Sequence, residues 1–310
     1  MPTRRTVLAS AASALALAAV PRTSRAENTK PATKLRYCLN TSTIREQNLS
    51  VPEQIALCGD VGYEGIEPWI RDLTAYSSGG GALADLKSQL DDAGVRVESA
   101  IGFAKWIVDD EAERQAGLAE LRRDMQTVAA LGGDAIAAPP IGAHRDSAKI
   151  PLDVIAERYA AALAIGREEG VAPQLEVWGF SDNLSKLADV MYVATAAADQ
   201  TACVLPDFYH LYKGGNDFAS VAMLPGTQVH CFHLNDIPTT IASADATDAD
   251  RVFPGLGDMP IAETLRGLIA SGFDGALSLE LFNKDYWKRP AREVAAEGLA
   301  AMKRATADLL

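Results

Sequence analysis

The stretch Leu205-Pro206-Asp207-Phe208-Tyr209-His210 decides how the second half of this sequence is interpreted. It completes a short apolar run, 202–205, which predicts a buried strand. A carboxylate and an imidazole follow that strand directly. Because ionisable side chains are rarely buried without a partner, they indicate that the strand ends in a functional site rather than in a packed layer.

Three further apolar runs in this half each carry one ionisable side chain, and each predicts a strand. They contain Glu176 (174–178), His233 (229–233) and Glu280 (276–280). Successive members of the set that also includes Asp207 are separated by about one strand and one helix, with a longer loop before Glu280. Two Glu, one Asp and one His, each on its own strand, form a set of metal ligands.

The whole chain shows an alternation of short apolar runs and helical segments. Strands are expected at 34–39, 65–69, 95–103, 134–138, 174–178, 202–205, 229–233 and 276–282, and helices at 50–62, 80–94, 109–132, 151–170, 183–198, 219–224, 261–272 and 290–310. Such alternation predicts parallel strands, and eight units close into a single-domain (β/α)8 TIM barrel. A doubly wound open sheet is the alternative, but no Gly-x-Gly-x-x-Gly follows the first strand.

The N-terminal residues predict an export signal rather than part of the fold. Arg4-Arg5 precedes an apolar, alanine-rich run (6–20), and Ser24-Arg25-Ala26 offers a cleavage site. The paired arginines resemble a twin-arginine signal, with an ordinary secretory signal as the alternative. We therefore expect a cleaved signal peptide (1–26), a linker (27–33) and the barrel (34–310), located in the periplasm. The apolar run is too short for a stable membrane anchor.

Charge and cysteine content narrow the possible partners. The formal net charge of −12 becomes −16 without residues 1–26, which hold four arginines and no acidic residue. Such a chain repels phosphate backbones, so nucleic acid is not an expected partner. Four cysteines show no metal-finger spacing, and a disulfide is left open. A homo-oligomer is compatible with the sequence.

A metal at the four strand ends explains the residue types found there. In a barrel the catalytic groups gather at the C-terminal ends of the strands. Three carboxylates around one point repel each other unless a cation lies between them. Mostly oxygen donors with one imidazole favour Mn²⁺, with Mg²⁺, Co²⁺ or Zn²⁺ as alternatives.

Several motifs together resemble the xylose-isomerase-like barrel family, the sugar phosphate isomerase/epimerase group. The group includes tagatose/psicose 3-epimerases, hydroxypyruvate isomerases and inosose dehydratases. The matching pieces are Gly62-Tyr63-Glu64-Gly65-Ile66-Glu67, Leu175-Glu176, Asp207-x-x-His210, Phe232-His233-Leu234-Asn235-Asp236, Arg251 followed by Pro254-Gly255-Leu256-Gly257-Asp258, and Leu279-Glu280. The resemblance implies that Glu176, Asp207, His233 and Glu280 bind the metal and that Glu176 and Glu280 also move the proton. It implies that His210 and Arg251 hold substrate oxygens.

Other side chains near the strand ends are further candidates for substrate binding. Asp182, six residues after Glu176, is placed to reach a hydroxyl. Trp178 and Trp106 fall at or just beyond predicted strand ends, where an aromatic face can stack on a sugar ring; ordinary loop packing is the alternative for each.

Some polar residues near these motifs have two interpretations or a structural one. Glu67 is expected to face inward, either in a structural ion pair or toward the substrate. Asp236 either orients His233 or begins the next loop. His230, three residues before His233, is expected on the other side, in a structural role.

This site is compatible with more than one reaction on a keto-sugar or polyol-derived ketone. A metal-chelated carbonyl acidifies the neighbouring C–H, and proton transfer through an enediolate gives isomerisation or epimerisation. Loss of a β-hydroxyl would instead make the protein an inosose- or keto-sugar dehydratase. A carbohydrate-binding barrel without turnover is a weaker alternative. A phosphodiesterase of the endonuclease IV type is disfavoured because the chain has only four histidines and is acidic.

Overall fold

A computed structural model describes residues 35–309 of the 310-residue chain. The expected signal peptide (1–26) and linker (27–33) lie outside these residues, so the structure does not bear on them. No helix within residues 35–309 is long and apolar enough to cross a membrane.

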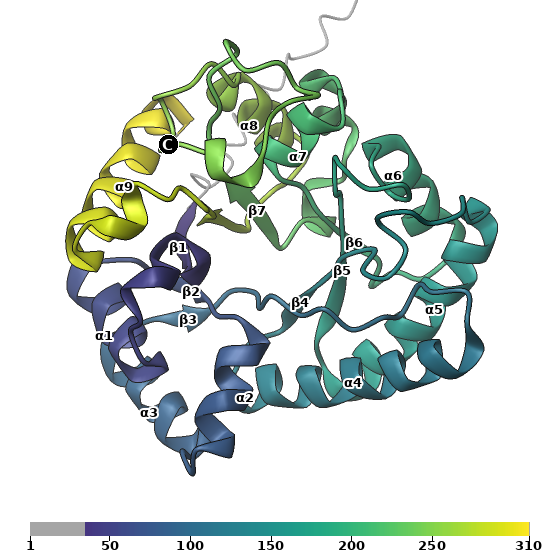
Figure 1. Ribbon diagram of the computed structural model, residues 1–310, viewed down its shortest axis with the longest axis horizontal. Helices are drawn as coiled ribbons and strands as arrows, with labels where there is room; N and C mark the ends of the chain where they lie inside the picture. The colour runs from purple at the N-terminus through teal and green to yellow at the C-terminus, as the bar shows by residue number, and fades with distance from the viewer. Residues whose placement is uncertain (1–34, 310) are drawn as a thin grey trace, which may run out of the picture. The chain divides into compact units, whose positions relative to one another are not determined.

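Eight parallel strands form the centre of the fold, each following the last around the barrel (Figure 1). They are β1 (Arg36–Asn40), β2 (Gly65–Glu67), β3 (Arg96–Val97), β4 (Ala135–Ala138), β5 (Ala172–Glu176), β6 (Cys203–Leu205), β7 (Cys231–Leu234) and β8 (Ala276–Leu279). Ladder pairing gives one sheet in the order β3-β2-β1-β8-β7 and another in the order β4-β5-β6.

Single contacts join the two sheets into a closed barrel. Asp207 and His233 form a parallel bridge between β6 and β7, with the His233 N–H donating to the Pro206 carbonyl at 2.9 Å. Beyond β3, the Ala137 N–H donates to the Ala100 carbonyl at 2.8 Å. The expected TIM barrel is therefore confirmed, and its two thin seams lie between β6 and β7, at the predicted site, and between β3 and β4.

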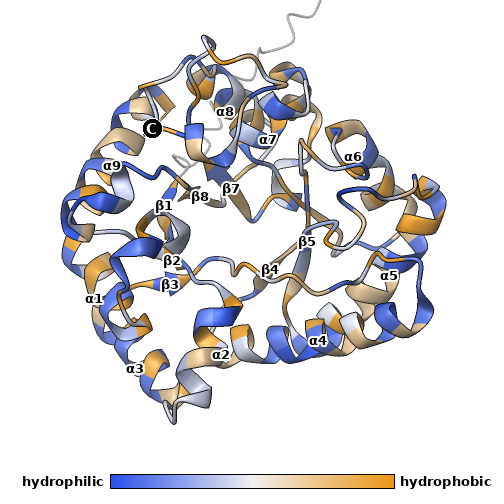
Figure 2. Ribbon diagram, viewed as in Figure 1, coloured by the Kyte–Doolittle hydropathy of each residue, from blue (hydrophilic) through white to orange (hydrophobic). Residues whose placement is uncertain are grey.

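Helices surround the strands (Figure 1). They are α1 (Val51–Val61), α2 (Ile70–Ser78), α3 (Leu83–Ala93), α4 (Glu111–Ala130), α5 (Leu152–Glu169), α6 (Leu187–Ala196), α7 (Phe208–Lys213), α8 (Ile261–Ala270) and α9 (Ala291–Ala305). The helix stops expected at Gly94 and Gly170 are present, with left-handed φ of 65° and 72°. Figure 2 shows hydrophilic and hydrophobic residues alternating along α1 and α4, as surface helices require.

The structure differs from the sequence expectation in three places. The strand expected at 95–103 is regular only at Arg96–Val97, and the rest is irregular apart from a bridge from Ile101 to Trp69. The helix expected from 183 begins at Leu187, because Asn183 is occupied in bonds to the 143–150 loop. Two helices, α2 and α7, were not expected.

One acidic side chain lies on the buried face of α4. Asp124 is 8% exposed, lines a cleft between α2 and α4, and makes no hydrogen bond or ion pair within residues 35–309. Burial, with help from Glu120, raises the pKa of Asp124 to about 7.

Asp124 should make stability pH-dependent. The pKa of Asp124 is higher in the folded than in the unfolded protein. Its contribution to stability is therefore complete below the unfolded-state pKa and is lost as pH rises through the folded-state pKa of about 7. We expect Asp124→Asn to gain about 1–3 kcal/mol over the unsubstituted protein between pH 5 and pH 8 in urea unfolding. Glu157→Gln, at an exposed acid on α5, is the control. A stability difference that does not change with pH would contradict the assignment.

Candidate active site

The four predicted ligands meet because their strands end at the same side of the barrel. Glu176 is the last residue of β5, and His233 lies within β7. Glu280 directly follows β8, and Asp207 lies two residues after the end of β6. All four side chains are buried, so their charges must be balanced inside the protein.

The Asp207-x-x-His210 motif has a local explanation. Asp207 is the N-cap of α7, and its Oδ1 accepts from the His210 N–H at 3.0 Å and from Asn235 Nδ2 at 3.2 Å. These bonds fix the carboxylate and leave Oδ2 facing the site. The cap thus orients a site residue and starts a helix with the same side chain.

His233 is held in one orientation by a carboxylate behind it. Its Nε2 lies 3.1 Å from Glu67 Oε2, and both groups are fully buried. Glu67 also accepts from Asn40 Nδ2 at 2.9 Å and Ser278 Oγ at 2.6 Å. With Nε2–H donating to Glu67, the lone pair of Nδ1 points toward the site. Glu67 therefore has the ion-pairing position that was one of its two expected roles.

Three carboxylates surround the other ring nitrogen. Nδ1 of His233 lies 3.2 Å from Glu280 Oε2, 3.3 Å from Asp207 Oδ2 and 3.9 Å from Glu176 Oε1. Yet Nδ1 is a buried atom with no hydrogen bond of acceptable geometry. Ligand atoms of Asp207, His233 and Glu280 all lie within 4.8 Å of one another. An orphaned nitrogen facing converging oxygens fits a divalent cation.

A second group around His233 fits a metal less well. Glu67, Cys231 and His233 also lie within 4.8 Å of one another. Burial, reinforced by Glu67, raises the pKa of the Cys231 thiol well above its usual value. A neutral thiol is a poor ligand, so we assign the site to the Nδ1 side. All four cysteines are unpaired.

Arg251 lies inside the carboxylate cluster. Its Nη1 is 2.6 Å from Glu280 Oε2 and 2.9 Å from Asp207 Oδ2, and its Nη2 is 2.6 Å from Asp248 Oδ1. Burial opposes its charge, but these acids outweigh burial and raise the pKa of Arg251. The expectation that Arg251 holds substrate oxygens stays a prediction. In the structure its two terminal nitrogens bond protein carboxylates, and of its three nitrogens only Nε is buried without a partner.

The buried charged groups around His233 shift one another's pKa values. Burial opposes protonation of His233, but Glu280 and Glu67 outweigh it and raise the pKa of His233 well above its usual value. The same field that attracts a proton attracts a metal ion. Burial favours a neutral Asp207, but Arg251 outweighs it and holds the pKa of Asp207 well below its usual value. Burial lowers the pKa of His210 to about 4, so its imidazole is neutral at pH 7.

A cavity of about 200 Å³ opens beside these groups. Five of the predicted site residues line it: Glu176, Trp178, His210, Arg251 and Glu280. Asp207 and His233 lie behind them, with no exposed surface. The rest of the wall consists of apolar and aromatic residues with one acid: Trp69, Ile101, Phe103, Phe180, Phe282 and Asp248. The cavity therefore combines a charged floor with aromatic sides.

Gly179 allows the aromatic wall to form. A Cβ at this position would lie 2.2 Å from the His210 carbonyl oxygen and 2.5 Å from the Gly214 nitrogen. Only glycine lets the chain pass this close to α7 between Trp178 and Phe180. The two rings, 5.3 Å apart, thereby face the cavity.

Two predicted substrate-binding residues are not among the cavity lining. Trp106 is fully buried, donates its Nε1–H to the Pro139 carbonyl at 3.0 Å and packs on Tyr159. Trp106 therefore packs within the protein, which was the alternative to sugar stacking, and its predicted place in the site is corrected. Asp182 accepts from the Ser147 N–H at 3.0 Å and joins two loops. Sequence spacing placed both near strand ends but could not show which way each side chain turns.

Other polar residues of the site were not singled out from the sequence. Asn40, the last residue of β1, donates to Glu67 and to Glu280 Oε1 (3.2 Å). In the sequence, only the position of Asn40 at the end of a predicted strand could have indicated this role. Asp248 comes from a long loop and had none. Asp236 accepts from the Gly255 and Met259 N–H groups at 2.8 and 2.9 Å, so it organises that loop.

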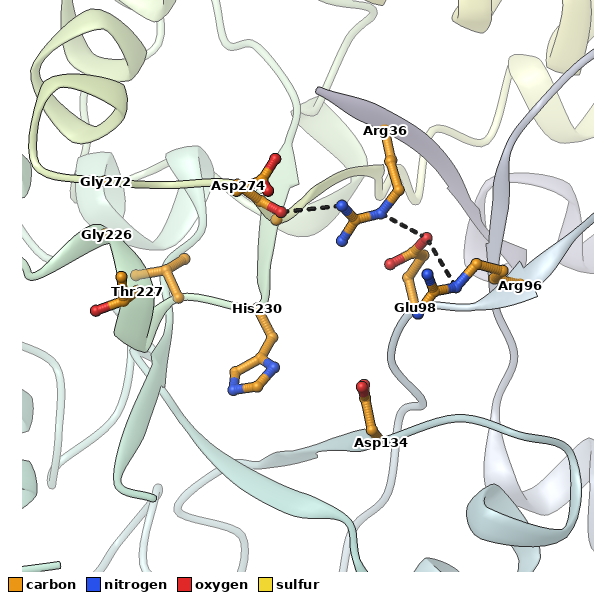
Figure 3. Close-up of a pocket in the computed structure, with 11 residues that line it drawn as sticks. Arg36, Arg96, Glu98, Asp134, Gly226, Thr227, His230, Gly272 and Asp274 are labelled. Carbon is orange, nitrogen blue, oxygen red and sulfur yellow. Dashed lines mark hydrogen bonds and ion pairs between the residues drawn. The ribbon is translucent and has the colours of Figure 1, made fainter. Parts of the chain in front are cut away.

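The opposite end of the barrel carries a separate polar pocket. There Arg36 donates to Glu98 at 2.9 Å and to the Asp274 carbonyl at 2.9 Å (Figure 3). His230 lines this pocket and not the cavity beside His233. Its residues lie where β1, β3 and β7 begin, which in barrels is the end that supports stability.

Comparison with known proteins places this chain in a family. The xylose isomerase-like TIM barrel family matches residues 55–305. This chain belongs to that family. The resemblance drawn from the sequence motifs is thereby confirmed.

Relatives of this family member carry different activities in their names. An inosose isomerase of Bacillus velezensis is 24% identical over 261 residues, covering 84% of this chain and 92% of that protein. A 3-dehydroshikimate dehydratase of Pseudomonas aeruginosa is 26% identical over 266 residues, covering 82% of this chain but 39% of that longer protein.

Solved structures agree with the fold. The crystal structure of an IOLI protein with a bound zinc atom gives a TM-score of 0.82 at 21% identity, covering 89% of this chain and 99% of the other. The structure of an L-ribulose 3-epimerase gives a TM-score of 0.71 at 17% identity, covering 89% of this chain and 96% of the other. At these identities the likeness is one of fold.

We expect binding of a divalent metal to depend on Asp207 and His233. Adding Mn²⁺ at 100 times its Kd should stabilise the protein by about 2.7 kcal/mol, seen as a rise in Tm. Asp207→Ala and His233→Ala should lose that rise and the bound metal. Asp92→Ala, at an exposed acid on α3, is the control. An Asp207→Ala protein that still carries one metal per chain would show that the site is misassigned.

Proposed function

We propose that this protein is a divalent-metal-dependent isomerase or epimerase that acts on a keto-sugar or a polyol-derived ketone. One observation supports this most strongly: Glu176 and Glu280 reach the same histidine nitrogen from β5 and from the end of β8, and both line the cavity. A substrate in that cavity would therefore contact two carboxylates that approach from different strands. Mn²⁺ is the metal that we propose, from the donor set.

The charge arrangement supports metal-assisted proton transfer. Glu67, Glu176, Asp207 and Glu280 place four carboxylates around His233. Arg251 pairs with two of the three on the Nδ1 side, Asp207 and Glu280. A bound divalent ion would balance this excess and polarise a substrate carbonyl, acidifying the C–H beside it. The protein's own contribution is to place a base on either side of that carbon.

The proton steps follow from the two carboxylates. One of them takes the proton from carbon, and the electron pair of the C–H bond moves toward the carbonyl oxygen. If the other carboxylate returns a proton to the same carbon from the opposite face, the centre is inverted. If the proton goes to the adjacent carbon, the carbonyl group moves to the carbon that lost its proton, which is an isomerisation. The neutral His210 is placed to bond a hydroxyl, and the aromatic wall excludes water.

A dehydratase is the second candidate, and one observation favours it. Burial, with Glu280 and Asp207 adding to it, raises the pKa of Glu176 to about 8. A carboxyl that keeps its proton near pH 7 can protonate a departing hydroxyl, which dehydration requires. Relatives of this chain include dehydratases as well as isomerases.

We expect Glu176→Gln and Glu280→Gln to remove turnover while retaining metal. An amide oxygen can still coordinate but cannot accept a proton, so kcat should fall at least about 10²-fold. Incubation with keto-sugars in D₂O, followed by NMR and mass spectrometry, separates the reactions. Carbon-bound deuterium without loss of water indicates an isomerase or epimerase, and loss of water indicates a dehydratase. Near-normal rates in both variants would contradict the two-base mechanism.

We further propose that the protein works in the periplasm on an unphosphorylated substrate. Support comes from the sequence of residues 1–26, with Arg4-Arg5 before an apolar run. Replacing Arg4-Arg5 by Lys-Lys should keep the protein in the cytoplasm, as measured by cell fractionation. Continued export would indicate the general secretory route instead.

A further inference from the structure

One guanidinium packed against the aromatic wall of the reaction cavity has no assigned role. Arg45 follows β1 in a short 3-10 helix, Thr41–Gln47. Its Cζ lies 3.9 Å from the centroid of the Trp69 ring and 5.1 Å from that of Phe282. Both rings line the cavity, and Arg45, which is not itself a lining residue, packs against this aromatic edge.

Arg45 has no anionic partner within residues 35–309. It makes no ion pair and donates no hydrogen bond, and its Nη2 is buried without an acceptor. Burial, together with the neighbouring Arg71, lowers the pKa of Arg45 from its usual value. A buried donor without a partner is costly, so an acceptor that arrives with a ligand would relieve that cost.

A second arginine beside the same ring shows the contrast. The Cζ atom of Arg251 lies 4.9 Å from the centroid of the Phe282 ring, and three carboxylates compensate the charge of this arginine. Phe282 thus contacts one guanidinium that is ion-paired with carboxylates and one that makes no ion pair within residues 35–309. In a chain with a net charge of −12, a cation beside the cavity that makes no ion pair within the described residues needs a reason.

We propose that Arg45 binds a carboxylate of the substrate, and so selects an acidic cyclic ketone over a neutral one. This inference rests on the proposed function and names its substrate class. A planar guanidinium matches a planar carboxylate through two parallel hydrogen bonds. Its stacking on Trp69 fixes the plane of the fork, so little freedom is lost on binding. A phosphate would need additional donors, and Arg71, the next guanidinium on Trp69, is paired with Asp72 at 3.2 Å.

The test compares an acidic with a neutral cyclic ketone in the metal-loaded protein. We expect Arg45→Met, which keeps the apolar stem, to raise KM for 3-dehydroshikimate roughly 10- to 100-fold and to change KM for an inosose less than about threefold. Arg45→Lys should recover part of the loss. Arg71→Met removes the other guanidinium on Trp69 and should affect neither substrate. An equal loss for both ketones would assign Arg45 a packing role and overturn the proposal.

Equilibrium binding keeps the inference separate from the proposed reaction. We expect calorimetry to show that quinate binds more tightly than myo-inositol and that Arg45→Met removes the difference, even if no turnover is found. Absence of turnover with this result would overturn the reaction but not the carboxylate subsite. Failure to bind quinate, or preference for an inositol phosphate that depends on Arg45, would overturn the carboxylate assignment.

Discussion

A histidine fixed between carboxylates is the constraint on which this structure depends. Glu67 holds one nitrogen of His233, and three acids surround the other. None of these side chains has meaningful access to water, so the protein must supply both the charges and their compensation. The closed barrel makes this possible, because it brings the ends of β5, β6, β7 and β8 to one place.

The surrounding structure serves to keep these groups in position. Asp207 caps α7 with one oxygen and presents the other to the site. Asn40 spans Glu67 and Glu280, which links the support behind the histidine to a carboxylate in front of it. Arg251 joins Asp207 to Glu280 and draws in Asp248 from a distant loop. A site fixed by so many shared partners suits a reaction that moves a proton between defined positions.

Sequence reasoning could predict the barrel and the ligand set because both depend on regular features. Strand-helix alternation fixes the topology, and an ionisable side chain in an apolar strand is a conspicuous pattern, as at Glu176. It could not orient side chains that follow the strands: Trp106 turns into the core, whereas Trp178 turns to the cavity. The sequence did not single out Arg45, because its proposed role rests on the lack of an ion pair within residues 35–309, which only three-dimensional contacts reveal.

The metal centre is the central claim, and anomalous diffraction tests it most directly. Crystals grown with Mn²⁺ and measured near the manganese edge should show one strong peak within about 2.5 Å of His233 Nδ1 and of oxygens from Glu176, Asp207 and Glu280. A peak on the Glu67 and Cys231 side of the ring, or no peak at saturating Mn²⁺, would contradict the account.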